Sequence, residues 1–254
     1  MKKKIALIVI ALFMGVSMSF AQTVDDIINK HVEAMGGKEK LAALKALKLV
    51  MSIEIGPNMK APATIVLVNG TKMRLDMSIQ GMTMVQVVTG DSGWAINPFG
   101  GKKEAERMNK EEIQASKDQL NITGELYDYK AKGNTVELIG KEDMEGTETY
   151  KLKVTKKNGD VDYIFLDAKT YLELKITSKH KFKDKEIESD ELLSNYKKVD
   201  GIMFAFTREE RMSGEAQGQS MTADSIEVNP KIDDKIFIMP DAAATAPNPP
   251  PAGK

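Results

Sequence analysis

Strict alternation of apolar and charged residues is the feature that most constrains this chain, and it is clearest in residues 160–181. Residues 162–166 and 171–178 are rich in aromatic and β-branched side chains, and residues 167–170 form a polar turn between them. Alternation places the two sets of side chains on opposite faces of a strand. This stretch therefore predicts an antiparallel hairpin with one dry face and one wet face. The predicted core-facing residues are Leu172, Leu174 and Ile176, and the predicted water-facing residues are Glu173, Lys175 and Thr177.

The same alternation recurs along most of the chain, divided by strong turn signals. Asn69-Gly70 and Asn158-Gly159 are typical of two-residue hairpin turns, and other Gly-containing turns separate further runs of strand length. Closely spaced short strands are typical of a barrel, a sandwich or a strongly curled sheet. We therefore predict a mainly β (α+β) fold of about eleven antiparallel strands, in a single domain over residues 22–240.

Two segments break the alternation and predict helices. Residues 23–35 carry an apolar stripe, with Thr23 as N-cap and Asp26 in the capping-box position, and Gly36-Gly37 follows the last turn. A second short helix is expected over residues 38–46. Residues 102–121 are charged and lack alternation, and Asn109 is a candidate N-cap there. We expect this central segment to interrupt the strands and to lie across the sheet.

The two ends of the chain are expected to lie outside the fold. Residues 1–21 combine three lysines, an apolar run and a small-residue cleavage signal ending at Ala21, which is the pattern of a signal peptide. The alternative is an uncleaved membrane anchor. No cysteine follows the cleavage site to carry a lipid, so we expect a periplasmic protein that is not itself lipidated, with secretion as the alternative. Residues 241–254 are rich in Ala and Pro and are predicted to be disordered.

Composition excludes several classes of function. Removal of the three leader lysines changes the net charge from −1 to −4, which argues against a nucleic-acid partner. The absence of cysteine excludes disulfides, Cys-ligated zinc and a thiol nucleophile. The two histidines, His31 and His180, lack partners at metal-ligand spacing. We predict a protein that is not an enzyme and that has no metal and no cofactor. The acidic stripe Glu186, Glu188 and Asp190 is expected to be solvated, with a catalytic carboxylate pair as the alternative.

Methionine is unusually frequent. The chain has 16 methionines, and six of them fall within residues 51–84. Methionine is flexible and polarizable, so it can line a surface that accepts differing apolar shapes. The alternative is that these side chains fill an ordinary core.

Several segments, in this order along the chain, resemble the outer-membrane lipoprotein-sorting proteins of the LolA/LolB type, in particular a branch common in Bacteroidetes. They are the first helix ending in Gly36-Gly37, WAINPF at 94–99, YIFLD at 163–167 entering YLELK at 171–175, YKKVDGIMF at 196–204, and VNPKIDD at 228–234. The resemblance covers nearly all of the chain after the leader. It implies an open, incomplete antiparallel β-barrel whose concave face is plugged by helices.

The resemblance also implies a function, a partner and a set of residues. We expect a carrier that binds lipid or lipoprotein acyl chains in the apolar concavity without catalysis, as a monomer with transient membrane contact. Arg74 is the candidate latch for a helical lid, and 57–59 and 98–99 are candidate membrane-contacting tips. The alternative function is a ligand- or protein-sensing regulatory module of the cell envelope on the same fold, with envelope proteins as partners. The predicted ligand-binding residues are Met51, Ile53, Met73, Leu75, Met77, Met84, Trp94, Leu172, Leu174, Ile176 and Phe204.

Overall fold

The computed structural model describes residues 22–56, 59–182, 185–212 and 218–240. The expected signal peptide, residues 1–21, and the expected disordered tail, residues 241–254, lie outside the described residues, as do Pro57 and Asn58 of one candidate tip. The predicted domain boundaries therefore stay predictions. In the described part of the chain, no helix is long and apolar enough to cross a membrane.

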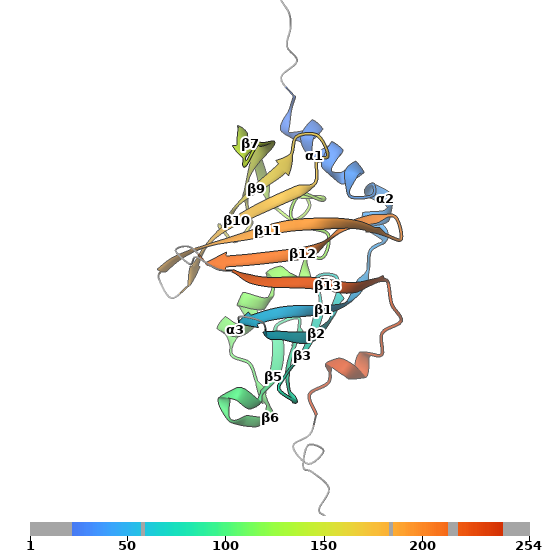
Figure 1. The fold of residues 1–254 in the computed structure, drawn as a ribbon, viewed down its shortest axis with the longest axis vertical. Helices are drawn as coiled ribbons and strands as arrows, with labels where there is room; N and C mark the ends of the chain where they lie inside the picture. Colours follow the sequence, from blue (N-terminus) through green and yellow to red (C-terminus); the bar gives the residue numbers. More distant parts are fainter. Residues whose placement is uncertain (1–21, 57–58, 183–184, 213–217, 241–254) are drawn as a thin grey trace, which may run out of the picture.

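Strands dominate the described chain, as the alternation predicts (Figure 1). The helices are α1 (Val24–Ala34), α2 (Lys38–Ala43) and α3 (Lys110–Ser116), with 3-10 turns η1 (Pro98–Gly100), η2 (Asp118–Leu120) and η3 (Asp234–Phe237). The strands are β1 (Ala46–Gly56), β2 (Met59–Val68), β3 (Lys72–Ile79), β4 (Met82–Thr89), β5 (Ser92–Asn97), β6 (Lys102–Arg107), β7 (Thr135–Met144), β8 (Thr147–Thr155), β9 (Val161–Asp167), β10 (Glu173–Phe182), β11 (Lys185–Val199), β12 (Ile202–Met212) and β13 (Gln219–Val228).

These thirteen described strands form one open antiparallel sheet in the order β6-β5-β4-β3-β2-β1-β13-β12-β11-β10-β9-β8-β7. Nearly every neighbour in the sheet is also a neighbour in sequence, so hairpins build almost the whole structure. The exception is the pairing of β1 with β13, which joins the two halves of the chain. The edge strands β6 and β7 are consecutive in sequence but lie at opposite ends of the sheet. The prediction of an open antiparallel barrel is therefore confirmed.

The two faces of the sheet carry different side chains and different cover. We call the face that contacts the helices the inner face; in β1 it is formed by Leu47, Leu49, Met51 and Ile53. Ile27 and Ile28 of α1 pack on it over β8 and β9, and Leu41 of α2 packs on it over β12 and β13. The prediction that helices plug this face is confirmed. Thr23 and Asp26 form the predicted capping box at the start of α1.

A connecting stretch that we call the bridging segment, residues 108–134, runs from edge strand β6 to edge strand β7 across the inner face. Ile113 and Leu120 pack against Met73 and Val88 of the first sheet half. Leu126, which is 1% exposed, packs instead with α1, β8 and β9. The bridging segment therefore joins the cores of the two sheet halves.

The opposite face, which we call the outer face, is covered in a different way. Over β2, β4 and β5, Val66, Val87 and Trp94 pack against Phe237 of η3. The chain after β13 thus lies against this face, far from α1 and α2 in Figure 1. Over β8 to β11, lysines cover aromatic rings: the ammonium group of Lys151 lies 5.1 Å from the ring centre of Phe165, and that of Lys175 lies 5.5 Å from it.

One strand was missed by the sequence prediction. Residues 102–107 were assigned to a charged, non-alternating segment, but they form β6 and pair with β5. The strand lies at the edge of the sheet and has one neighbour only, so it needs little apolar surface, and charged residues are common on such edges.

Leu126 offers a test of the bridging segment. We expect Leu126→Ala to lower the free energy of unfolding by about 2–5 kcal/mol, because it leaves a cavity where two parts of the core meet. Leu138→Ala is the matched control: Leu138 lies on edge strand β7 and is 37% exposed, so its truncation should cost about 1 kcal/mol or less. Urea unfolding followed by circular dichroism measures both, and equal losses would contradict the proposed packing.

Candidate functional site

One apolar cluster on the inner face contains only sheet residues among those described. Its centre is Met51 and Ile53 of β1, each 6% exposed, together with Ala63 of β2. Unlike those of the other inner-face clusters, its described members include no residue of a helix or of the bridging segment. Met84 lies directly opposite Met77 in the β3–β4 pair and extends the same face. We call this surface the methionine patch; its residues are Met51, Ile53, Ala63, Leu75, Met77, Met84 and Met221.

The structure brings together five of the predicted ligand-binding residues in the methionine patch, namely Met51, Ile53, Leu75, Met77 and Met84. Three others lie on the inner face but belong to covered clusters. Met73 packs beneath Ile113 and Leu120 of the bridging segment, Ile176 packs with the α1 cluster, and Phe204 packs with the α2 cluster. Leu172 precedes β10. Leu174 lies near the start of β10, at the point where the pairing of β10 with β9 shifts its register.

Trp94 and Arg74 lie on the outer face, so their predicted placement in the concavity is corrected. Strand pairing sets Arg74 opposite Val87, and Val87 opposite Trp94. The Trp94 indole Nε1 donates to the carbonyl of Phe237 at 3.0 Å. Arg74 donates through Nη1 to the carbonyl of Ile236 at 2.6 Å. Arg74 therefore holds the chain after β13 and does not latch a lid on the inner face.

Four of the eight exposed large apolar side chains in the described part of the chain lie at one end of the sheet. Met59, Met82, Phe99 and Met212 are 39–45% exposed, and each lies at the connection of a hairpin: β1–β2, β3–β4, β5–β6 or β12–β13. Because the strands alternate in direction and β13 is antiparallel to β1, these four connections lie at the same end. We call them the apolar rim. Ile55, in contact with the methionine patch, continues β1 toward this end.

A buried ionisable pair, His31 and Glu173, lies where α1 meets the start of β10. Alternation placed Glu173 on the wet face, and the structure corrects this: the register shifts between Glu173 and Lys175, and the Glu173 side chain is 12% exposed. Its Oε1 lies 3.7 Å from Nε2 of His31. Thr177 is also buried, at 7% exposure, with its hydroxyl donating to Asp190 at 2.6 Å.

The geometry of His31 fixes where one of its protons sits. Its Nδ1 lies 2.9 Å from the carbonyl oxygen of Tyr171, and because a carbonyl only accepts, Nδ1 carries the hydrogen. Nε2 of the neutral ring and an ionised Glu173 carboxylate are both acceptors, so a proton on either group is needed for a hydrogen bond between them. Burial raises the pKa of the Glu173 carboxyl, although His31 and Arg208 act in the opposite direction. Neutralisation of this carboxyl is therefore favoured in the fold.

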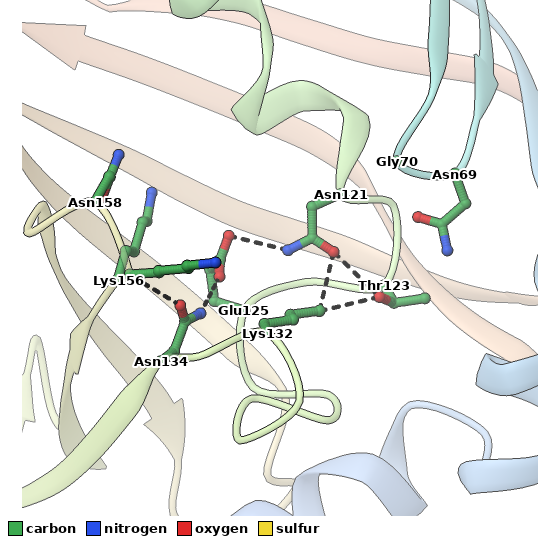
Figure 2. A pocket seen from close by; sticks show the side chains of 10 residues that line it. Asn69, Gly70, Asn121, Thr123, Glu125, Lys132, Asn134, Lys156 and Asn158 are labelled. Atoms are coloured by element: carbon green, nitrogen blue, oxygen red, sulfur yellow. Dashed lines mark hydrogen bonds between the residues drawn. The ribbon is translucent and has the colours of Figure 1, made fainter. Parts of the chain in front are cut away.

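A second site is a polar cavity of about 390 Å³ between the bridging segment and two hairpin turns (Figure 2). Lys132 donates to Asn121 Oδ1 at 3.0 Å and to Thr123 Oγ1 at 3.2 Å. Glu125 accepts from the amides of Asn121 and Asn134 at 2.9 and 2.7 Å. Burial lowers the pKa of Lys132. These groups largely satisfy one another, and their polarity makes the cavity unsuited to an acyl chain. Its lining residues are Asn69, Gly70, Asn121, Thr123, Glu125, Lys132, Asn134, Lys156, Lys157 and Asn158.

Metal-ligating side chains do not gather within the described residues, where no group of three or more His, Asp or Glu could hold an ion. The candidate sites are therefore the methionine patch with its apolar rim, the buried pair His31 and Glu173, and the polar cavity. The sequence pointed to the first through its methionines. It contained no local signal for the other two, because they depend on contacts between distant segments.

Glu173 gives a pH prediction whose sign follows from its raised pKa. A carboxyl whose pKa in the folded state exceeds its ordinary value of 4.5 binds its proton more tightly in the fold. Its contribution to stability is fully present below the pKa of the unfolded chain and is lost as the pH rises through the folded pKa. We expect Glu173→Gln to remove this loss, so that the variant gains stability relative to the wild type as the pH rises above about 4.5.

Melting temperatures measured across this range test the expectation. Glu33→Gln is the control, because Glu33 is an exposed carboxylate on α1, the helix that also carries His31. A parallel pH dependence in wild type and Glu173→Gln would rule out a buried, proton-binding carboxyl at this position.

Comparison with known proteins supports the fold. No family model and no curated protein matches the sequence. Three solved structures do match in shape. A LolA superfamily protein from Nitrosomonas europaea has a TM-score of 0.57 at 10% identity, over 85% of this chain and 97% of that one. A DUF1329 family protein from Desulfovibrio piger has a TM-score of 0.58 at 15% identity, over 89% and 100%. A domain named for outer-membrane lipoprotein sorting, from Vibrio parahaemolyticus, has a TM-score of 0.53 at 13% identity, over 84% and 94%. The chain therefore has the fold of the LolA superfamily.

Proposed function

We propose that this protein binds the acyl chains of lipids or lipoproteins on the methionine patch and carries them through the periplasm without catalysing a reaction. The observation that carries the proposal is the composition of the patch. It is an apolar cluster on the inner face whose described members all come from the sheet. The likeness in fold to a LolA superfamily protein and to a lipoprotein-sorting domain supports the same function.

Burial of an acyl chain is a sufficient source of affinity. Each buried CH₂ group contributes about 0.8 kcal/mol, so a 16-carbon chain offers roughly 12 kcal/mol before the costs of ordering and association. Methionine suits this role because its flexible thioether adapts to chains of different length and bend. No reacting group is needed, since the free energy comes from removal of apolar surface from water.

The apolar rim supplies a route for loading and release. Met82 lies directly opposite Ile79 in the β3–β4 hairpin, and Met84, two residues further along β4, lies opposite Met77 of the patch. Apolar side chains thus continue from the rim to the patch along one hairpin. We propose that the rim contacts a membrane surface transiently, so that a chain passes between the bilayer and the patch with little exposure to water. Transport toward the outer membrane follows from this proposal and from the expected periplasmic location.

Met77 is the position that tests acyl binding most directly. We expect Met77→Glu to weaken uptake of a fluorescent 16-carbon fatty acid by about tenfold or more, because a carboxylate beside the buried chain has to be desolvated. Val50→Glu introduces the same charge on the outer face of β1, where Val50 is 36% exposed, and should leave uptake unchanged. Fluorescence titration measures both, with circular dichroism to confirm folding.

Two results would contradict the proposal. One is the absence of uptake by the wild-type protein, together with a lipid-free mass in native mass spectrometry of freshly purified protein. The other is an equal loss of uptake in both variants. Recovery of one stoichiometric envelope protein without lipid would instead favour the regulatory alternative.

Phe99 tests membrane contact at the rim. We expect Phe99→Ser to reduce co-sedimentation with phospholipid vesicles about tenfold, because a buried Phe side chain contributes about 1.5–3 kcal/mol. Ile238→Ser is the control, since Ile238 is 65% exposed but belongs to the segment on the outer face. Equal effects of the two substitutions would show that exposed apolar area in general, and not the rim, determines binding.

A further inference from the structure

The methionine patch adjoins charged side chains on the same face of the sheet. Arg208 of β12 lies directly opposite Met221 of β13, and Met221 lies directly opposite Ile53 of β1. Directly opposed residues of antiparallel strands share a face. The inner face therefore changes from apolar to charged within one cross-strand row.

Three charged groups make up this region, which we call the charged patch: Glu191, Arg208 and Glu210. Arg208 donates through Nη1 to Glu191 Oε1 at 2.8 Å. Glu210 lies directly opposite Glu191 in the β11–β12 pair. The Arg208 side chain is 50% exposed and that of Glu191 is 27% exposed, so both are accessible to a ligand. The charged patch has one positive and two negative groups.

The guanidinium group of Arg208 can accept a further partner while it keeps Glu191. A guanidinium carries five N–H donors in a planar fork. The one hydrogen bond found for Arg208 among the described residues uses Nη1, which leaves the other N–H groups for an anionic oxygen. The carboxylates of Glu191 and Glu210 likewise retain acceptor positions for a cation.

These charges discriminate between head groups when an acyl chain lies on the methionine patch. A purely anionic head group meets Arg208 but is repelled by two carboxylates, and an uncharged head group gains no ionic contact. A head group with both signs pairs its anionic oxygens with Arg208 and its ammonium group with Glu191 or Glu210. Opposite charges that are arranged to match give specificity between ligands that bury equal apolar area.

We propose that the charged patch selects acyl amphiphiles with a zwitterionic head group, in which a phosphate and an ammonium group lie a few bonds apart. The inference rests on the proposed function, since the methionine patch has to hold the chain. It adds a polar preference that burial of an acyl chain does not by itself supply.

Competition against a bound fluorescent fatty acid tests the selection. The competitors are three single-chain lipids with the same acyl chain: lysophosphatidylethanolamine (zwitterionic), lysophosphatidylglycerol (anionic) and a monoacylglycerol (uncharged), each below its micelle-forming concentration. For the wild-type protein we expect the zwitterionic lipid to displace the probe at a concentration at least about tenfold lower than either of the others, since one well-placed ionic contact is worth about a factor of ten.

Variants assign the effect to the patch. The double variant Glu191→Gln with Glu210→Gln should shift the preference to the anionic lipid, because Arg208 then lacks its ion-pair partner Glu191 and the nearby carboxylate of Glu210. Arg208→Gln should remove the advantage of the zwitterionic lipid over the uncharged one, because no cation then pairs with its phosphate. Arg211→Gln is the matched control, since Arg211 pairs with Glu209 at 2.8 Å and lies at a position of β12 that faces the other side of the sheet.

The outcomes separate this inference from the function on which it rests. If the probe binds and the three lipids compete equally, or if the anionic lipid competes best, the selection is overturned while acyl binding stands. If the wild-type protein does not bind the probe, both are overturned. A zwitterionic preference that survives in the double variant and in Arg208→Gln would also overturn the assignment to these residues.

Discussion

The structure depends on one constraint: its two edge strands are consecutive in sequence yet lie at opposite ends of a thirteen-stranded sheet. The bridging segment between β6 and β7 has to cross the inner face to connect them. In doing so it carries Ile113 and Leu120 into one sheet half and Leu126 into the other. Contacts of this kind close a long loop, so burial of apolar side chains has to offset the entropy that loop closure costs. The segment must therefore be well packed at both ends.

The cover on the inner face is uneven as a result. Helices α1 and α2 and the bridging segment contribute residues to three apolar clusters, and each of those clusters mixes sheet with covering elements. Among the residues that the structure describes, the methionine patch is the inner-face cluster built from the sheet alone. Its central residues, Met51 and Ile53, are nevertheless nearly buried, and long flexible side chains such as Met77 and Met221 pack against them. A surface of this kind can remain closed in water and rearrange for an apolar ligand without movement of a strand.

Alternation and hairpin signals were sufficient to predict much of the fold. Asn69-Gly70 lies in the turn that connects β2 to β3, as expected, although the pairing of Val68 with Lys72 makes the connection three residues long and not two. The side-chain placements that were wrong share one physical cause, which is that a distant segment sets the environment of the residue. Trp94 belongs to a region that is apolar on both faces, and only η3, more than a hundred residues later, decides which face holds the ring. Glu173 broke the pattern because the irregular start of β10 turns it toward His31, whose helix lies at the other end of the sequence.

The candidate site was also predictable only in part. Methionine frequency and spacing identified the patch, since both are local properties of β1 to β4. The neighbouring charges were not recognised, because alternation makes Glu191 and Arg208 look like ordinary solvent-facing positions of two long strands. Only the pairing of β12 with β13, and of β13 with β1, places Arg208 in the same row as Ile53. In the proposed function, the methionine patch supplies affinity and the adjoining charged patch supplies discrimination, so one face of the sheet meets both needs of an amphiphile.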